Sequence, residues 1–189
     1  GAEVAFLSTV GNDQLGDKAL SAILNTKIEP IITRSKLPTG VAKVSNDGSF
    51  TIARGTAWEN ISVPISSGRD LQLLYFGSLA QVSKENRSSL KTLLDRKPKY
   101  VLVDLNLREN CYTKQTIEDC LYYATMLKVN EKEWDIVSEI TGINEPELLM
   151  RQKRLNAMAV TRGENGATLY SAAGAIEFQP NTIDLVDQT

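Results

Sequence analysis

Apolar residues along this chain gather in short runs that alternate with longer, helically spaced segments. The short runs are rich in Val, Ile, Leu, Phe and Tyr and lie between turn residues, a pattern typical of strands. A run without strict polar alternation, as at residues 100–103, indicates a buried parallel strand. The pattern predicts strands at residues 4–10, 30–34, 71–76, 100–103, 126–129, 157–160, 167–170, 175–178 and 183–186.

Five segments between these strands carry apolar residues at helical spacing. The first includes Leu15, Ala19 and Ile23, and the second follows the capping residue Ser83. The others lie at residues 113–124, 131–140 and 145–155. Strands that alternate with helices predict an α/β fold, with a doubly wound, mostly parallel sheet flanked by helices. The closely spaced strands late in the chain predict an antiparallel edge.

Residues 41–44 and 50–52 interrupt this alternation with a hairpin signal. They flank Ser45-Asn-Asp-Gly48-Ser49, a turn sequence in which Gly48 suits a positive φ. A hairpin inserted in an alternating chain predicts a small β-hairpin lid. Two strands alone cannot bury residues such as Val44, so we expect the lid to pack across a ligand site or against the lid of a second subunit.

Polar residues alternate with leucines where the fourth predicted strand ends. We expect Asp104, Asn106 and Arg108 to leave the carboxyl end of this strand on one side, and ligands of open α/β sheets bind at that edge. An acid, an amide and a guanidinium suit a hydroxylated, phosphorylated or metal-bound ligand. Gly77 and Ser78 end the preceding strand at the same edge. The alternative is a solvated strand end at which Asp104 pairs with Arg108.

Two further motifs follow strands. Asn130 ends one strand and Glu133 stands in the first turn of the next helix, which places amide and carboxylate about one turn apart; helix capping is the alternative use of both. Thr161, Gly163 and Gly166 offer a hydroxyl and exposed backbone N–H groups to a nucleotide phosphate or ribose. Any strand-to-strand turn can carry two such glycines, and the chain has no Walker loop and no G-x-G-x-x-G opening a helix.

The composition of the chain excludes several kinds of catalytic site, metal site and partner. The chain has no histidine, which excludes histidine bases, Ser/His triads and Cys/His zinc sites from it. A formal net charge of −2, with dispersed lysines and arginines, argues against a nucleic-acid partner. Cys111 and Cys120 do not make a disulfide framework, which favours a reducing, cytoplasmic compartment. No apolar run approaches the length of a membrane span.

The order and spacing of these motifs resemble those of the ribokinase-like sugar kinases of the PfkB type, and within them the fructokinase and 2-keto-3-deoxygluconate kinase branch. The resemblance spans the whole chain. It rests on Gly1 and Gly11, Val10-Gly-Asn-Asp13 with Gly16, Pro38-Thr39-Gly40, Ala57-Trp58, Phe76-Gly-Ser-Leu-Ala80, Asp104-Leu-Asn-Leu-Arg108, Lys128-Val-Asn130-Glu-Lys-Glu133 and Thr161-Arg-Gly163-Glu-Asn-Gly166-Ala.

The resemblance implies a partial ribokinase-like α/β domain at residues 1–189 with the lid at residues 39–58. It implies an enzyme that uses ATP and Mg²⁺ to phosphorylate a hydroxymethyl group of a ketose or related sugar. A homodimer through the lid would fit. The alternatives are a nucleoside kinase of the same fold and a non-catalytic binding or assembly remnant.

The resemblance also suggests a role for each motif residue. Glu133 would organise Mg²⁺ indirectly, and Arg108 would contact phosphate. The residues expected to bind ATP are Asn130, Thr161, Gly163 and Gly166. Those expected to border the sugar are Gly11, Asp13, Gly77, Ser78, Asp104 and Asn106.

The departures from the family pattern lie at the two ends. Family members carry an earlier sugar-contacting segment and a later Asp-Thr-x-Gly-Ala-Gly-Asp signature, of which Asp187-Gln188-Thr189 resembles the opening. We therefore expect an internal fragment whose catalytic base lies beyond Thr189. Such a fragment would have no catalytic base of its own and would be inactive alone.

Overall fold

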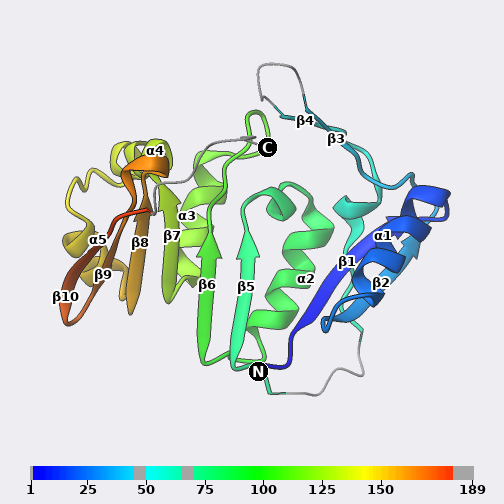
Figure 1. Cartoon of the computed structure of the whole chain (residues 1–189), viewed down its shortest axis with the longest axis horizontal. Coiled ribbons are helices and arrows are strands. Elements are labelled where there is room, and N and C mark those ends of the chain that lie inside the picture. Colours follow the sequence, from blue (N-terminus) through cyan, green and yellow to red (C-terminus); the bar gives the residue numbers. More distant parts are fainter. Residues whose placement is uncertain (1, 45–49, 65–69, 181–189) are drawn as a thin grey trace. The chain divides into compact units, whose positions relative to one another are not determined.

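The computed structural model describes residues 2–44, 50–64 and 70–180, and its contacts divide the chain into two compact units (Figure 1). Of the described residues, the first unit contains 2–44, 50–64 and 83–95, and the second contains 70–82 and 96–180. No helix in the described ranges is long and apolar enough to cross a membrane.

The first unit opens with the predicted strand–helix–strand arrangement. Strand β1 (Ala5–Gly11) pairs in parallel with β2 (Glu29–Ser35), and α1 (Gln14–Leu24) connects them. Helix α1 begins where Asp13, in extended conformation, accepts a hydrogen bond from the backbone N–H of Gly16. An N-cap side chain of this kind satisfies a backbone donor that the helix itself leaves unpaired.

Helix α2 (Lys84–Leu94) of the same unit is capped by Ser83, as the sequence predicts, and it packs on the short helix η1 (Ala57–Asn60). The buried side chain of Asn86 connects the two segments. Its Nδ2 donates to the Trp58 carbonyl at 2.9 Å, and its Oδ1 accepts from the Ile61 N–H at 2.7 Å. A polar side chain is stable in this buried position because its amide is hydrogen-bonded on both ends.

The predicted lid strands are present. Strand β3 (Ala42–Val44) pairs antiparallel with β4 (Phe50–Ile52). The predicted turn at residues 45–49 lies outside the described residues. Val44 is 50% exposed, so apolar surface of the lid is available to a further contact.

The second unit is built on a six-stranded sheet in the order β10-β9-β8-β7-β6-β5 (Figure 1). Strands β5 to β8 are parallel, whereas β9 and β10 are antiparallel, which confirms the predicted late edge. The predicted strand at residues 183–186 lies outside the described part of the chain. The strands are β5 (Leu73–Gly77), β6 (Tyr100–Asp104), β7 (Met126–Asn130), β8 (Ala157–Thr161), β9 (Ala167–Ser171) and β10 (Gly174–Phe178).

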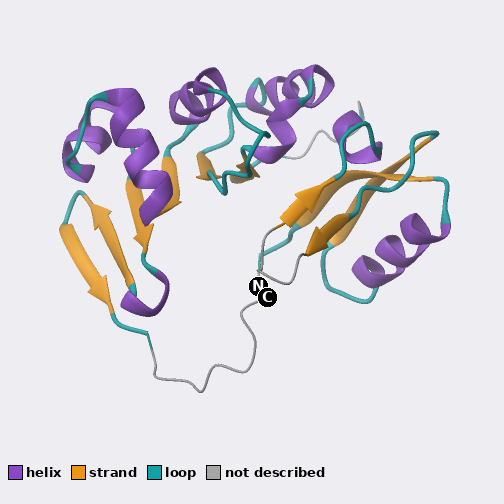
Figure 2. Cartoon of the chain, turned by 90° about the horizontal axis from the view of Figure 1, so that it is seen from above, coloured by secondary structure: helices purple, strands orange, loops and turns teal. Residues whose placement is uncertain are grey.

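Three helices lie on one side of these strands (Figure 2). They are α3 (Lys114–Tyr123), α4 (Glu131–Thr141) and α5 (Pro146–Lys153), and the short helices η2 (Leu79–Val82) and η3 (Gly163–Asn165) follow β5 and β8. Parallel strands added in one direction by right-handed crossovers place successive helices on the same face. The strand residues buried on that face are Val101, Val103, Leu127, Val129, Met158 and Val160. The predicted α/β class, a mostly parallel sheet with flanking helices, is confirmed.

Candidate active site

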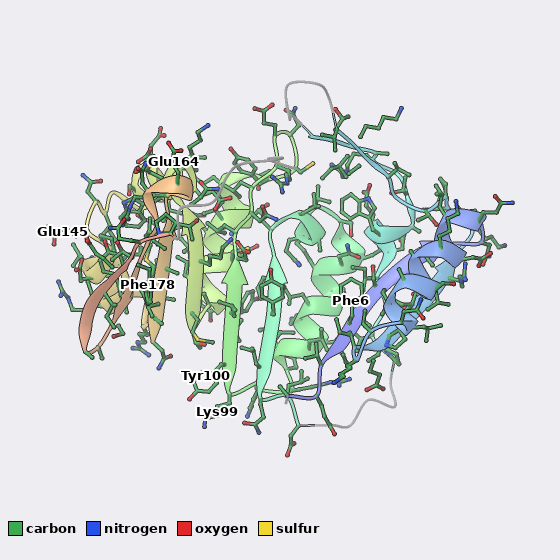
Figure 3. All side chains as sticks on the ribbon, viewed as in Figure 1. Phe6, Lys99, Tyr100, Glu145, Glu164 and Phe178 are labelled. Atoms are coloured by element: carbon green, nitrogen blue, oxygen red, sulfur yellow. The ribbon has the colours of Figure 1, made fainter. Side chains whose placement is uncertain are left out.

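The carboxyl ends of the four parallel strands meet at one edge of the second unit's sheet. The residues that end β5, β6, β7 and β8 are Gly77, Asp104, Asn130 and Thr161. The strand register places the first two opposite each other and the last two opposite each other. Glu164 lies at the same edge, and Lys99 lies at the opposite one (Figure 3). The sheet therefore brings four of the predicted site residues of this unit to one edge.

Asn130 and Glu133 form a reciprocal capping box at the start of α4. The Asn130 Oδ1 accepts from the Glu133 N–H at 2.9 Å, and the Glu133 Oε2 accepts from the Asn130 N–H at 2.9 Å. The second carboxylate oxygen, Oε1, accepts from the Leu107 N–H at 2.8 Å. Glu133 is only 4% exposed. The capping alternative is thus present, and the role of Glu133 toward Mg²⁺ stays a prediction.

Asp104 forms an ion pair with Lys128, its register partner on β7. The Lys128 Nζ lies 2.9 Å from both Asp104 carboxylate oxygens, and the Tyr75 hydroxyl donates to Oδ2 at 3.4 Å. Burial of the Tyr75 phenol, together with the nearby Asp104 carboxylate, raises the pKa of Tyr75. Most of the binding capacity of Asp104 is therefore directed at neighbouring strands.

The segment after β6 does not continue the strand. Asn106 has a φ of 42°, in the left-handed region, so the alternation expected across Asp104, Asn106 and Arg108 ends at Asp104. Leu105 is fully buried, whereas Asn106 is exposed. Asn106 therefore lies outside the strand, whereas the sequence pattern implied that it continues the alternation of the strand. Asn is among the few residues that adopt this conformation readily.

Gly77 and Ser78 support this segment from the end of β5. A Cβ on Gly77 would lie 3.0 Å from the Asp104 carbonyl oxygen, so the strand end favours glycine. Ser78 is 1% exposed, and its hydroxyl donates to the Leu105 carbonyl at 2.5 Å. The hydroxyl that we expected to border the sugar is thus engaged within the protein.

The turn after β8 is closed by its own backbone. The N–H groups of Asn165 and Gly166 donate to the carbonyls of Arg162 and Gly163. The expectation of exposed backbone donors is therefore wrong for Gly166. Gly163 and Gly166 have φ values of 55° and 82°, which favour glycine. A Cβ on Gly166 would lie 2.0 Å from the Phe178 carbonyl oxygen, so close packing against β10 also requires glycine there.

In the first unit, the predicted residues Gly11 and Asp13 meet Thr39 of the lid segment. The Asp13 carboxylate accepts from the Thr39 hydroxyl at 2.6 Å and from the Thr39 N–H at 2.8 Å, in addition to its helix cap. The Gly11 N–H donates to the same hydroxyl at 2.8 Å. The Thr39 hydrogen bonds, then the Gly16 N–H and the charge of Arg34, hold the pKa of Asp13 below its ordinary value.

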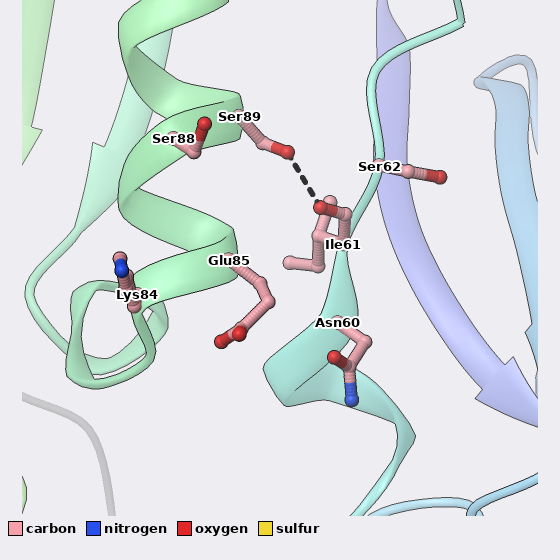
Figure 4. A pocket seen from close by; sticks show the side chains of 7 residues that line it. All are labelled: Asn60, Ile61, Ser62, Lys84, Glu85, Ser88 and Ser89. Atoms are coloured by element: carbon pink, nitrogen blue, oxygen red, sulfur yellow. Dashed lines mark hydrogen bonds between the residues drawn. The ribbon is translucent and has the colours of Figure 1, made fainter.

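A groove in the first unit contains none of the predicted site residues. It has a volume of about 510 Å³ and lies between α2 and the segment after η1 (Figure 4). Lys84 and Glu85 line one side, and Asn60 and Ile61 line the other. The Ser89 hydroxyl crosses it and donates to the Ile61 carbonyl at 2.6 Å. The hydroxyl serves the packing of α2 on this segment.

Sequence reasoning missed Lys128 and Thr39 because each acts on a partner that is distant in the chain. Lys128 faces Asp104 only once β6 and β7 are paired in the observed register. Two signals were available: Lys128 shares the face of Asn130 by strand alternation, and Thr39 belongs to a motif that resembles a lid segment.

Comparisons with known proteins identify the family of the chain. The model of the pfkB family of carbohydrate kinases matches residues 1–189. The chain belongs to the pfkB family of carbohydrate kinases, and kinases of this family are phosphotransferases. A comparison with curated protein sequences gives no match.

Solved structures of kinases share the fold. The fructokinase from Xylella fastidiosa with bound ATP is 20% identical with a TM-score of 0.87, and the match covers 99% of this chain and 64% of that one. The aminoimidazole riboside kinase from Salmonella enterica is 22% identical with a TM-score of 0.80, covering 99% and 66%. The fructokinase from Vibrio cholerae with fructose, ADP and calcium is 21% identical with a TM-score of 0.83, covering 100% and 66%. The chain thus spans just under two thirds of these relatives.

Proposed function

We propose that this chain is part of an ATP-dependent sugar kinase that transfers the γ-phosphate to a hydroxymethyl group of a ketose or related sugar. The match of the carbohydrate kinase family over residues 1–189 carries this proposal. Two of the similar structures are fructokinases, one with ATP and one with fructose and ADP. A cytoplasmic location would supply both substrates.

The carboxyl edge of the second unit's sheet is the proposed nucleotide-binding side. Asn130 and Thr161 lie opposite each other there, and the turn with Gly163 and Gly166 follows. Ligands of α/β sheets bind beyond the carboxyl ends of the strands. In this proposal the Asn130 amide and the Thr161 hydroxyl bind ATP, and the two glycines shape the turn beside it.

Mg²⁺ fits this edge as an ion held mainly by the nucleotide. The described ranges contain no group of three or more acidic, cysteine or histidine side chains that could hold a metal. Mg²⁺ in kinases commonly binds through phosphates and water with one or two carboxylates. When bound, the ion neutralises charge on the phosphates. Glu133 would influence it only indirectly, since both its oxygens accept backbone N–H groups.

The side chains proposed to contact the sugar differ in their exposure, in their chemistry and in the hydrogen bonds that they make within the protein. Asn106 is exposed and offers both a donor and an acceptor. Arg108 suits phosphate. In the second unit, Ser78 and Asp104 bond within the protein, so they would act mainly by shaping the surface around them. In the first unit, Asp13 bonds Thr39 and Gly16, so it would act mainly by holding these segments in place.

A nucleoside kinase is the second candidate, because one similar structure is a riboside kinase with its riboside and an ATP analogue. The deciding experiment compares kcat/KM of the full-length protein for fructose, 2-keto-3-deoxygluconate, adenosine, inosine and aminoimidazole riboside. Preference for a free sugar supports the proposal, and preference for a nucleoside supports the second candidate. No phosphorylation of any of these compounds would favour a binding or assembly role.

A further inference from the structure

The backbone after β6 is hydrogen-bonded to three other segments of the second unit. The Leu105 N–H donates to the Lys128 carbonyl of β7 at 3.1 Å. The Leu105 carbonyl accepts from both the N–H and the hydroxyl of Ser78, which follows β5. The Leu107 N–H donates to the Glu133 Oε1 of α4 at 2.8 Å. Residues 105–107 are thereby fixed to β7, to the residue that follows β5 and to the first turn of α4.

The residues between and after these contacts have left-handed backbones. The φ values of Asn106 and Asn110 are 42° and 60°. Asparagine adopts this region more readily than other non-glycine residues do, and the surrounding attachments select it over an extended conformation. Among the three attachments of residues 105–107, Glu133 supplies the one that follows Asn106 directly in the chain.

Both oxygens of the Glu133 carboxylate bond to the protein backbone. It is 4% exposed, and its two oxygens accept from two backbone N–H groups that belong to different segments, the Asn130 N–H at the start of α4 and the Leu107 N–H after β6. A carboxylate is an acceptor at both oxygens, and a glutamine amide is an acceptor at only one. Glu131 lies in the same first helical turn but is exposed. Removing its charge changes the helix terminus equally and leaves the Leu107 contact intact.

We propose that Glu133 is a positioning residue that acts through the Leu107 N–H: it holds residues 105–108 in the conformation that presents Asn106 at the carboxyl edge of the sheet. This proposal rests on the proposed kinase function for its effect on turnover. It departs from the expected role toward Mg²⁺, because the carboxylate acts on the protein backbone rather than on the ion.

The test compares Glu133→Ala with Glu131→Ala in the full-length protein. Alanine at position 133 leaves no acceptor for the Leu107 N–H. Amide hydrogen exchange at Leu107, measured by NMR, should therefore accelerate at least about tenfold in Glu133→Ala and should not change in Glu131→Ala. With the preferred sugar, kcat of Glu133→Ala should fall at least about tenfold. The Mg²⁺ concentration for half-maximal rate should stay within about twofold of wild type. Glu133→Asp keeps the charge but is one methylene shorter, so it should resemble Glu133→Ala.

Unchanged Leu107 exchange in Glu133→Ala overturns the proposal, and so does a raised Mg²⁺ requirement that Glu133→Asp restores. If Glu133→Ala does not fold, Ser78→Ala provides the second variant: it removes one of the two hydrogen bonds to the Leu105 carbonyl without touching a carboxylate. It should accelerate exchange at Leu105 to Leu107 and lower kcat, and wild-type values in both would overturn the proposal. If the wild-type protein phosphorylates nothing, the proposed function fails, while Leu107 exchange still decides the contact.

Discussion

Asp13 shows how one side chain can join a helix start to a distant loop. Its carboxylate accepts the Gly16 N–H that begins α1 and two donors of Thr39, a residue 26 positions later in the chain. The same Thr39 hydroxyl accepts from the Gly11 N–H. The end of β1, the start of α1 and the segment that leads into the lid therefore depend on a single ionised group.

This dependence predicts a specific response to acid. Because the pKa of Asp13 is lower in the folded protein than its unfolded value of about 3.9, its contribution is complete above that value and is lost as the pH falls through the folded pKa. Asp13→Asn should lower the free energy of unfolding at pH 7 and flatten its decline below about pH 4. Denaturant unfolding at several pH values measures both effects.

Asp17→Asn serves as the matched control for Asp13→Asn. The Asp17 side chain is 68% exposed and pairs with Arg34 at the surface, so its loss should change the unfolding free energy at pH 7 by less than about 1 kcal/mol. Equal pH profiles for Asp13→Asn and the wild type would contradict the assignment of Asp13.

The sequence identified most of the polar side chains that end strands or begin helices, but not the groups that they contact. It placed Asp104 and Glu133 at strand and helix ends, where the structure also has them. The contact of Asp104 with Lys128 follows from strand register, and that of Glu133 with Leu107 follows from a left-handed residue at Asn106. The local pattern of apolar and polar residues predicts neither the strand register nor the left-handed conformation of an asparagine.

Among the elements, the described strands and helices follow the sequence pattern closely, because a strand or helix that must be buried needs the matching apolar period. The pattern gave a wrong prediction where the alternation of apolar and polar residues continued beyond the end of a strand. Leucines continue to alternate with polar residues after Asp104, yet the strand ends there and Leu105 turns into the core. Alternation alone cannot reveal that a backbone has left the sheet.

The two glycines in the turn between β8 and β9 provide a test of how this turn packs. Gly166→Ala combines a left-handed φ with a Cβ 2.0 Å from the Phe178 carbonyl oxygen of β10, whereas Gly163→Ala has the left-handed φ and open space. Gly163→Ala should cost about 1 kcal/mol of unfolding free energy, and Gly166→Ala should cost clearly more and loosen β10. Denaturant unfolding of both variants measures the difference, and equal costs would contradict the described packing of the turn on β10.

For the whole molecule, the lid offers a test of assembly. We predict that the full-length protein is a dimer through β3 and β4, because Val44 is 50% exposed and a two-stranded hairpin needs a partner surface. Val44→Asp should shift the sedimentation coefficient toward that of the monomer. Leu24→Asp, at a 60% exposed position on α1, should not. A monomeric wild type whose lid remains unprotected from hydrogen exchange when sugar is bound would contradict this prediction.

The proposed reaction is phosphoryl transfer from ATP to a sugar hydroxymethyl group. The most direct measurement incubates the full-length protein with ATP, Mg²⁺ and fructose, follows ADP release, and identifies the product by ³¹P NMR and mass spectrometry. We expect ADP release that depends on sugar, and one equivalent of a sugar phosphate monoester on a primary hydroxyl for each ADP. ADP release without a phosphorylated product, or phosphate found only on a nucleoside when both acceptors are present, would contradict it.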